Sequence, residues 1–425
     1  MRIKLVTFAP HPNFGTCLQS YALNKVLKDM GHDVEFIYNG REEKLLGISG
    51  WIRSFIKFVL PSEMAYKIKK KRSEIIESNK LSLESEPIPY VISLPNNYIH
   101  YFISKLPFYS VFYKLYKCTS LQWKKVYKFA FEDGNYKMRR IYTRKQYEEV
   151  VRDADLFITG SDQIWNPYCG GFNPMMFLEF AGEKKRVAYS SSISRPSIPM
   201  AVKDRMRDDL SKFDYIGVRE QKSVELLNEL LNRKDVKLVV DPTLLLSAED
   251  WMEFGNRAKI EFELPEKYIF CYFVGDKRVD FYNQMVEDVK QYTGISDVIT
   301  LECYNRPLNY GGGRLYNDAG PYEWVYLLSH ASYVCMDSFH ATVFALKFQK
   351  DFVHAMKNVE GETGSQNTRM YDILNRYGLS YKIYNSQADA WKKNIDYINI
   401  EGIMNSEIIE SMLFLKQELS SGEVI

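Results

Sequence analysis

The sequence predicts an α/β protein with two domains, each built on a sheet of parallel strands. Short apolar segments of strand length alternate with amphipathic segments of helical spacing over most of the chain, and this alternation is typical of βαβ units. Glycine or polar residues follow several strand segments directly, as they do where parallel strands end at a ligand-binding edge. The chain has 425 residues, more than one hydrophobic core usually supports, so we expect two domains.

Composition and charge are those of an ordinary globular protein. Hydrophobic residues make up 46% of the chain and charged residues 26%, with a formal net charge of +2, so any anion-binding site must be local. No apolar run reaches the length of a transmembrane helix, and the first residues lack a signal-peptide cleavage site, so we expect a cytoplasmic protein. The six cysteines form no C-x-x-C pair, which argues against a disulfide framework and a structural zinc site.

The chain begins with a predicted βαβ unit. A buried strand, an amphipathic helix and a second strand follow one another within residues 3–38. The loop after the first strand of such a unit faces the ligand edge of the sheet, so Asn13, Gly15 and Gln19 are candidate substrate-binding residues. The alternative is that Asn13 and Gly15 are simply good turn residues.

Residues from about 41 to 145 differ in character from the rest of the chain. Aromatic and basic residues mix in Trp51–Leu60, and residues 67–72 are almost wholly basic. We interpret this segment as a helical insertion with a solvated basic face. The alternative is a surface that contacts the inner membrane face or a lipid-linked phosphate, because basic segments with Trp and Phe suit the bilayer interface. No nucleic-acid-binding motif accompanies the basic residues, so we do not expect a nucleic-acid partner.

A predicted strand at Asp155–Thr159 ends in a polar loop. Polar side chains are costly at a sheet edge unless they bind something or hydrogen-bond within the loop. The candidate binding residues of this loop are Gly160, Ser161, Asp162, Gln163, Trp165 and Asn166. The alternative is a hydrogen-bonded loop that only fixes the domain.

A cation follows another predicted strand of the same sheet. Tyr215–Val218 leads directly into Arg219 and then into a helix. Because a guanidinium group binds two oxygens of a carboxylate or phosphate at once, Arg219 is a candidate anion-binding residue at the mouth of the crevice. A structural ion pair is the alternative.

The second domain contains the stretch with the most chemistry. Tyr333–Lys347 runs from an apolar strand directly into an apolar helix, with Asp337, Ser338 and His340 at the junction. Unpaired N–H groups at the first turn of such a helix favour an anion, and histidine exchanges protons near neutral pH. A core histidine capped by Asp337 is the alternative.

Both domains are predicted to be Rossmann-like, because each repeats the strand–helix alternation of a parallel sheet. The predicted organisation is an N-terminal domain at 1–245 with the insertion at about 41–145, a C-terminal domain at 246–400, and a C-terminal helix at 401–425.

With these motifs laid out, the chain resembles the polysaccharide pyruvyl transferase family. The motifs that carry the resemblance are Asn13-Phe-Gly-Thr-Cys-Leu-Gln-Ser-Tyr-Ala-Leu, Gly160-Ser-Asp-Gln-Ile-Trp-Asn, Val218-Arg-Glu-x-x-Ser, Asp241-Pro-Thr and Asp337-Ser-Phe-His-Ala-Thr-Val-Phe-Ala. The resemblance implies the two-domain GT-B arrangement with the active site in the cleft between the domains. It also implies transfer of the pyruvyl group of phosphoenolpyruvate to two hydroxyls of a sugar, in a cell-surface glycan or its lipid-linked precursor, with formation of a cyclic ketal.

The resemblance also implies roles for particular residues. His340 matches the catalytic histidine of the family, and Arg219 matches an arginine that binds the donor. The better-studied branch of the family carries Arg-Leu-His where this chain has Ser-Phe-His at 338–340, so one cation is missing. Phosphoenolpyruvate brings a carboxylate and a phosphate, whose burial requires compensating charge. Arg314 and Arg369 are the candidate replacements, together with the helix start at Ser338.

Ketal formation needs a proton donor and a base beside the two substrates. We expect His340 to be the general acid or base, held in one tautomer by Asp337 or another carboxylate. Asp162 is expected to bind or deprotonate the acceptor, and Trp165 to offer a flat face to a sugar ring. The reaction requires no metal, and we expect neither a metal nor a resident cofactor, with phosphoenolpyruvate as co-substrate.

Two other functions are compatible with the same sequence. A GT-B-type glycosyltransferase would use a nucleotide sugar as donor. A non-catalytic glycan-binding protein would bind an acceptor and turn over no donor.

Overall fold

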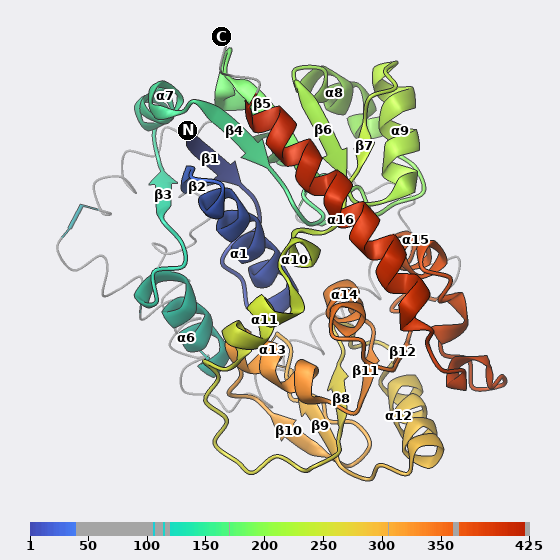
Figure 1. The fold of residues 1–425 in the computed structure, drawn as a ribbon. Helices are drawn as coiled ribbons and strands as arrows, with labels where there is room; N and C mark the ends of the chain where they lie inside the picture. Colours follow the sequence, from blue (N-terminus) through green and yellow to red (C-terminus); the bar gives the residue numbers. More distant parts are fainter. Residues whose placement is uncertain are drawn as a thin grey trace, which may run out of the picture.

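Two parallel sheets, one above the other in Figure 1, organise the chain. This computed structural model describes residues 1–39, 105–106, 114, 120–169, 171–304, 306–359 and 365–420. The insertion expected at about 41–145 therefore lies mostly outside the described residues, and so does the membrane contact attached to it. The part of that range from 120 onward is described, and it contributes a helix and an edge strand to the first domain.

The first sheet has seven parallel strands in the order of a Rossmann fold. In sheet order they are β3 (Met138–Ile141), β2 (Asp33–Asn39), β1 (Arg2–Val6), β4 (Leu156–Thr159), β5 (Lys185–Ser191), β6 (Tyr215–Val218) and β7 (Lys237–Leu238). The strand order reverses between β1 and β4, which pair directly. The loops that follow these two strands therefore lie side by side, at the point where such a sheet binds ligands.

The second sheet has five parallel strands with the same kind of reversal, between β8 and β11. In sheet order they are β10 (Arg314–Tyr316), β9 (Val298–Leu301), β8 (Ile269–Tyr272), β11 (Tyr333–Met336) and β12 (Phe352–His354). Both domains are thus Rossmann-like, as the sequence predicts.

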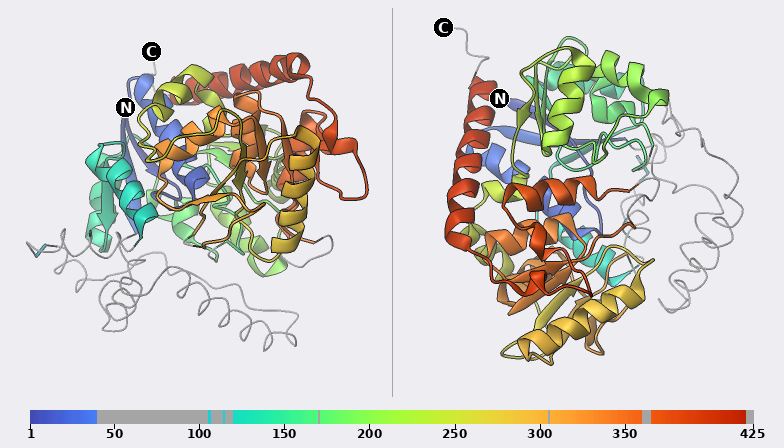
Figure 2. Two further views of the ribbon diagram at one scale, coloured as in Figure 1. Left: turned by 90° about the horizontal axis from the view of Figure 1, so that it is seen from below. Right: turned by 90° about the vertical axis from the view of Figure 1, so that its right-hand side faces the viewer.

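Helices cover the sheets and connect their strands (Figures 1 and 2). Those between the strands of the first sheet or directly after it are α1 (Phe14–Asp29), α6 (Leu121–Tyr127), α7 (Arg144–Asp153), α8 (Met200–Leu210), α9 (Gln221–Leu231), α10 (Pro242–Leu245) and α11 (Ala248–Gly255). Those of the second domain are α12 (Val279–Thr293), α13 (Pro321–His330), α14 (Phe339–Lys347), α15 (Thr368–Arg376) and α16 (Tyr397–Ser420). Short helical turns occur at Lys128–Glu132, Pro174–Phe177, Glu179–Ala181, Ser380–Lys382 and Ala390–Lys392.

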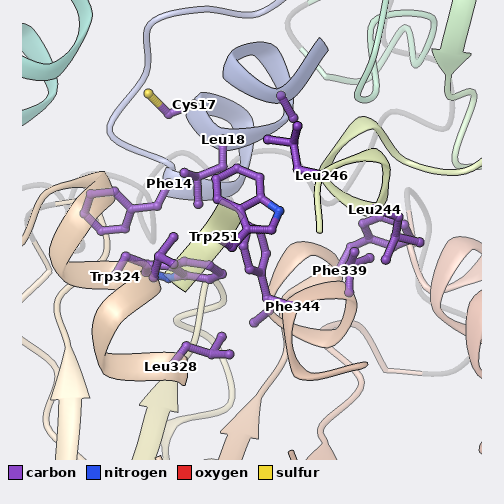
Figure 3. Close-up of a cluster of buried hydrophobic side chains, with 14 of the residues drawn as sticks. Phe14, Cys17, Leu18, Leu244, Leu246, Trp251, Trp324, Leu328, Phe339 and Phe344 are labelled. Atoms are coloured by element: carbon purple, nitrogen blue, oxygen red, sulfur yellow. The ribbon is translucent and has the colours of Figure 1, made fainter. Parts of the chain in front are cut away.

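A hydrophobic cluster joins the two domains. Trp251 of α11 packs against Phe344 of α14, with 4.8 Å between the ring centroids, and Phe344 lies 5.0 Å from Trp324 of α13. Figure 3 shows that Phe14 of α1 enters the same cluster from the first domain. This packing holds α1 and α14 against each other, and both helices begin at the carboxyl edge of their sheet.

The C-terminal helix α16 runs along one side of both domains (Figures 1 and 2). Its Ser411 hydroxyl accepts a hydrogen bond of 2.9 Å from the N–H of Val240, and its Glu418 carbonyl accepts one of 2.6 Å from Lys185. The helix therefore packs back on the first sheet.

The sequence did not predict the edge strands β3 and β10. Strand β3 has the sequence Met-Arg-Arg-Ile, and Arg139 within it pairs with Glu35 of β2 at 3.1 Å, so charged residues replace the apolar run that marks a strand. Strand β10 has three residues directly after a glycine-rich loop, too few to show an alternating pattern.

None of the helices in the described part of the chain combines the length and the apolarity needed to cross a membrane.

Glu302, directly after β9, is a buried carboxylate that we expect to make folding sensitive to pH. Its side chain is 3% exposed, its Oε2 has no partner among the described residues, and burial raises its pKa to about 7. A carboxyl group with a raised pKa favours the folded state at low pH. Its contribution is fully present below the unfolded-state pKa and is lost as the pH rises through about 7.

Glu302→Gln should therefore raise the free energy of unfolding at pH 8, by on the order of 2 kcal/mol, and change it little at pH 4. Denaturant unfolding at the two pH values measures the difference. Glu266→Gln, at an exposed position of the same domain, is the matched control and should show no such pH dependence. An equal effect of Glu302→Gln at both pH values would contradict the assignment.

Candidate active site

One carboxylate oxygen, Oδ2 of Asp241, links the two domains at the carboxyl edges of their sheets. It accepts a hydrogen bond of 2.8 Å from Nη1 of Arg219 and lies 3.4 Å from Oγ of Ser161. From the second domain, Nε2 of His340 approaches it to 3.5 Å. The other oxygen of Asp241 accepts from the N–H and the hydroxyl of Thr243, so the side chain also caps α10. Residues that follow β6 and β7 thus meet a residue that follows β11, which makes the carboxyl edges face each other in a GT-B arrangement.

His340 lies in the first turn of α14 and is 4% exposed. Its Nε2 points at Asp241 and makes no hydrogen bond to a described residue. On the other side of the ring lies Gly15 of α1, where an added Cβ would come within 2.3 Å of Nδ1. Glycine at position 15 therefore permits the close approach of α1 and α14 that encloses the imidazole.

Arg219 is the cation at the centre of the site. It is 2% exposed, and its Nη2 has no hydrogen-bond partner among the described residues, although Oδ1 of Asp162 lies 3.8 Å away. Burial opposes its charge, but the neighbouring carboxylates of Glu220, Asp241 and Asp162 more than offset this and raise its pKa. The guanidinium group lies 4.0 Å from the ring centroid of Phe339, a cation–π contact across the domain boundary.

The two central aspartates are held as carboxylates by the positive groups around them. Burial alone would raise the pKa of both Asp162 and Asp241, but His340 and Arg219 lower it below the ordinary value. Asp162 has a positive φ of 73° and accepts a hydrogen bond of 2.8 Å from the hydroxyl of Thr16. This left-handed backbone turns the loop after β4 towards the cleft.

Two further cations from the second domain face the same region. Arg369 of α15 lies 5.8 Å from the Phe339 ring centroid and donates no hydrogen bond to a described residue; its buried Nε is unsatisfied. Burial, and next the charge of Arg219, lower its pKa. Lys357, after β12, is half-buried, and burial lowers its pKa although Asp337 opposes the shift. Positive groups with unused hydrogen-bonding capacity therefore surround the centre of the cleft.

Several of the predicted site residues meet in this cleft. The structure brings together Asp162, Arg219, His340, Arg369 and Gly15, with Asn13 and Ser338 beside them. Ser338 caps α14 by accepting from the N–H of Ala341 at 3.4 Å. Gln163 crosses to the second domain, where its amide donates to Gln366 at 3.4 Å.

Three predicted roles are corrected by the geometry. Asp337 does not hold His340, because its carboxylate accepts from the N–H groups of Val274 and Gly275 and from the Tyr282 hydroxyl, at 2.6, 2.7 and 2.8 Å.

Trp165 offers no face to a sugar, since it is 1% exposed and stacks on Phe177 with 5.9 Å between centroids. Arg314 lies at the start of the edge strand β10, at the opposite end of the sheet from the cleft, and packs on Phe262 instead.

Other predicted residues shape the loops that carry the site. Gln19 is fully buried; its amide donates to Thr7, Phe8 and Thr16, and its carbonyl accepts from the N–H of Ser161. Asn166 is 1% exposed and donates to Gln163 at 2.9 Å. Gly160 has a φ of 114°, and an added Cβ would meet the Tyr189 carbonyl at 2.1 Å. The position therefore needs a residue without a side chain.

Sequence reasoning missed Asp241, Lys357 and Tyr304 as site residues. Asp241 had a visible signal, because Asp-Pro-Thr follows a predicted strand and was among the motifs of the resemblance. Lys357 and Tyr304 follow β12 and β9 in loops with no motif, so their position depends on the tertiary structure. In the described part of the chain, no group of three or more His, Cys, Asp or Glu side chains is arranged to hold a metal ion.

Comparison with known proteins identifies the family. A family model described as "Polysaccharide pyruvyl transferase" matches residues 13–356, a span that includes the cleft residues Asp162, Arg219, Asp241 and His340. The chain therefore belongs to the polysaccharide pyruvyl transferase family and is a transferase. The family implies a polysaccharide acceptor. No curated protein matches the sequence.

Solved structures with a similar course of the chain are distant in sequence. The UDP-GlcNAc 2-epimerase from Methanocaldococcus jannaschii is 10% identical, with a TM-score of 0.43 and coverage of 95% of this chain and 92% of that chain. The UDP-GlcNAc 2-epimerase from Neisseria meningitidis, bound to UDP-GlcNAc, is 11% identical, with a TM-score of 0.42 and coverage of 97% and 100%. A glycosyltransferase from Streptomyces sp. SF2575 is 11% identical, with a TM-score of 0.39 and coverage of 97% and 95%. At these scores we draw nothing from the likeness.

Gly15→Ala tests the enclosure of His340. In a helix, Ala is favoured over Gly, but here the methyl group would overlap the imidazole, so we expect a loss of stability of about 1–3 kcal/mol and displacement of His340. The control is Gly402→Ala in α16, where an added Cβ meets nothing within 4 Å and should stabilise by up to about 1 kcal/mol. Chemical denaturation measures both variants, and an unchanged or raised stability of Gly15→Ala would contradict the contact.

Proposed function

We propose that this protein transfers the pyruvyl group of phosphoenolpyruvate to two hydroxyls of a sugar, forming a cyclic ketal. The acceptor is a cell-surface polysaccharide or its lipid-linked precursor. Phosphoenolpyruvate is a co-substrate, and the proposal includes no resident cofactor. It also places the reaction in the cytoplasm, with peripheral contact at the inner membrane face where a lipid-linked acceptor would be presented.

The observation that carries the proposal is the pair of arginines on the Phe339 ring. Arg219 lies 4.0 Å and Arg369 lies 5.8 Å from the same ring centroid. Burial, and next the charge of Arg219, lower the pKa of Arg369, so two cations from different domains act on each other here. Each retains a buried N–H with no partner among the described residues. Two like charges at one ring, each with an unused donor, favour the binding of a dianion.

The same arrangement offers a replacement for the arginine that the better-studied branch of the family carries at position 338 and that this chain lacks. Ser338 here caps α14 and contributes no charge. Arg369 and Lys357 reach the cleft from the segments after β12, and the lowered pKa of each reflects a half-buried cation without enough compensating charge. An incoming carboxylate or phosphate would supply that charge. We therefore propose that Arg219, Arg369 and Lys357 together bind the donor.

His340 is the proposed proton-transfer group. Protonation of the methylene carbon of phosphoenolpyruvate leaves an oxocarbenium-like centre, which one sugar hydroxyl attacks; phosphate then departs and the second hydroxyl closes the ketal. Asp241 and Asp162 are placed to orient the imidazole ring of His340 and to accept a proton from the sugar acceptor.

Access to His340 requires the domains to separate. Its side chain is 5% exposed, Nε2 faces Asp241, and Nδ1 faces Gly15, so groups of the first domain shield both ring nitrogens. We propose that the donor enters while α1 and α14 are apart and that the cleft closes around it, as in other enzymes that must exclude water.

Arg369→Met tests donor binding without breaking an ion pair. It removes a cation that repels Arg219, so we expect an unchanged or higher Tm in the absence of ligand. Phosphoenolpyruvate should raise the Tm of the wild-type protein, and the variant should bind it about 10- to 100-fold more weakly. Arg205→Met, which breaks an ion pair on α8, is the control and should lower the Tm but keep the response. If only a nucleotide sugar raises the wild-type Tm, the protein is a glycosyltransferase instead.

His340→Ala tests the chemistry. Loss of a general acid or base typically reduces turnover by about 10²- to 10⁴-fold, and we expect that loss in phosphate release from phosphoenolpyruvate with methyl hexosides as acceptors. The matched control is His330→Ala, at an exposed position of α13, which should keep wild-type rates. Wild-type turnover in His340→Ala would reject the assignment.

A further inference from the structure

A hydrogen bond between Asn13 and Tyr304 crosses the cleft beside the catalytic centre. Nδ2 of Asn13, in the loop before α1, donates to the Tyr304 hydroxyl at 2.9 Å. Tyr304 lies in the loop after β9, at the carboxyl edge of the second sheet. The contact therefore joins the two domains at the same cleft as the contact between Asp241 and His340.

Asn13 does not use its side chain as an asparagine at the start of a helix normally does. It is the N-cap residue of α1, where an asparagine side chain usually accepts from a backbone N–H of the first turn. Here the side chain makes no such bond and reaches across the cleft. The amide is therefore not needed to start the helix.

The Asn13–Tyr304 pair has two unused hydrogen-bonding capacities. Oδ1 of Asn13 is buried and has no donor among the described residues. The Tyr304 hydroxyl accepts from Asn13, and no described residue accepts its hydrogen. One free acceptor thus lies beside one free donor. A hydroxyl group satisfies both at once, whereas a carboxylate or a fully ionised phosphate can only accept and leaves Oδ1 unsatisfied.

The pair lies close to the reacting groups. Asn13 is two residues before Gly15, which touches the His340 ring. Burial raises the pKa of Tyr304 well above its ordinary value, and the negative charge of Asp162 contributes to the shift, which requires the two side chains to be near each other. Tyr304 also has a φ of 58°, and non-glycine residues in that region concentrate at functional sites.

The surroundings of the pair suit a sugar ring. The His11 ring meets Tyr304 edge-on with 5.7 Å between centroids, and Trp123 meets His11 in the same way at 6.1 Å. The guanidinium group of Arg306 lies 5.0 Å from the Tyr304 ring. All four side chains are half-buried, so apolar faces stand next to the polar pair, as is typical of small-molecule sites.

We propose that Asn13 and Tyr304 bind a hydroxyl of an acceptor hexose, with Asn13 Oδ1 accepting from it and the Tyr304 hydroxyl donating to it. This hydroxyl positions the ring and does not itself react, because an attacking hydroxyl must lose its proton to a base and an amide oxygen is not one. The inference rests on the proposed function and adds specificity-determining residues for its acceptor.

The experiment uses the full-length protein, phosphoenolpyruvate, and a panel of methyl glycosides of galactose, glucose, mannose and N-acetylmannosamine. Tyr304→Phe and Asn13→Ala should each raise the KM for the hexoside about tenfold, the value of one hydrogen bond, and leave the KM for phosphoenolpyruvate within twofold. Tyr292→Phe, which loses a hydroxyl contact of 2.6 Å to the Lys392 carbonyl away from the cleft, should change neither.

Single-deoxy analogues of the hexoside that reacts locate the bound hydroxyl. Among those that still react, one should lose more than about tenfold in kcat/KM with the wild-type protein, because it lacks both bonds. It should lose nothing further with the double variant Asn13→Ala/Tyr304→Phe, which lacks the same two bonds. If removing the hydroxyl from the substrate costs as much in the double variant as in the wild-type protein, the inference is overturned.

The remaining outcomes separate this inference from the proposed function. If phosphoenolpyruvate does not raise the wild-type Tm, the proposed donor is rejected, and the inference that depends on it is rejected too. If it does but no hexoside is turned over, the inference is overturned and the donor stands. If Tyr304→Phe raises the KM for phosphoenolpyruvate instead, the pair binds the donor and the inference is also overturned.

Discussion

The arrangement of the cleft depends on the carboxylate of Asp241. Its Oδ2 meets Arg219 at 2.8 Å and His340 at 3.5 Å, so one buried negative charge faces two groups that are positive when protonated, one from each domain. A buried carboxylate is stable only when it is paired and hydrogen-bonded, and Thr243 and Ser161 complete that requirement. The same interaction that stabilises the closed cleft therefore brings the proposed acid and the proposed donor-binding cation together.

Hydrophobic packing stabilises the interface between the domains, whereas the charged site within it is only partly compensated. The cluster of Trp251, Phe344 and Trp324, which Phe14 enters from the first domain, holds the domains together through buried apolar area, which favours closure. Arg369 and Lys357 are half-buried without enough compensating charge, which is the reason for proposing that an anion binds there. The interface of this chain therefore combines stable apolar packing with cations that lack full charge compensation.

Much of the fold was predictable because it depends on local patterns. The strand and helix at Tyr333–Lys347, the βαβ unit at the start and the family motifs were visible as apolar periodicity followed by polar junctions. His340, Arg219 and Asp162 meet in the structure as the topology of parallel sheets suggested. The assignments that failed, Asp337, Trp165 and Arg314, depended on the direction of a side chain or on the end of a strand. The order of residues does not show either of these: Asp337 turns to the loop after β8, and Trp165 turns into the core.

The sequence by itself determined the two Rossmann-like domains, the family and the residues at the strand ends, because hydrophobic periodicity and short motifs act within a few residues of the chain. Only the tertiary structure decided that Asp241 is the partner of His340, that Gly15 encloses the imidazole, and that Asn13 meets Tyr304 across 291 positions. Those contacts join segments far apart in the chain. Their geometry follows from how α1 and α14 pack, a property of the assembled interface that no single segment contains.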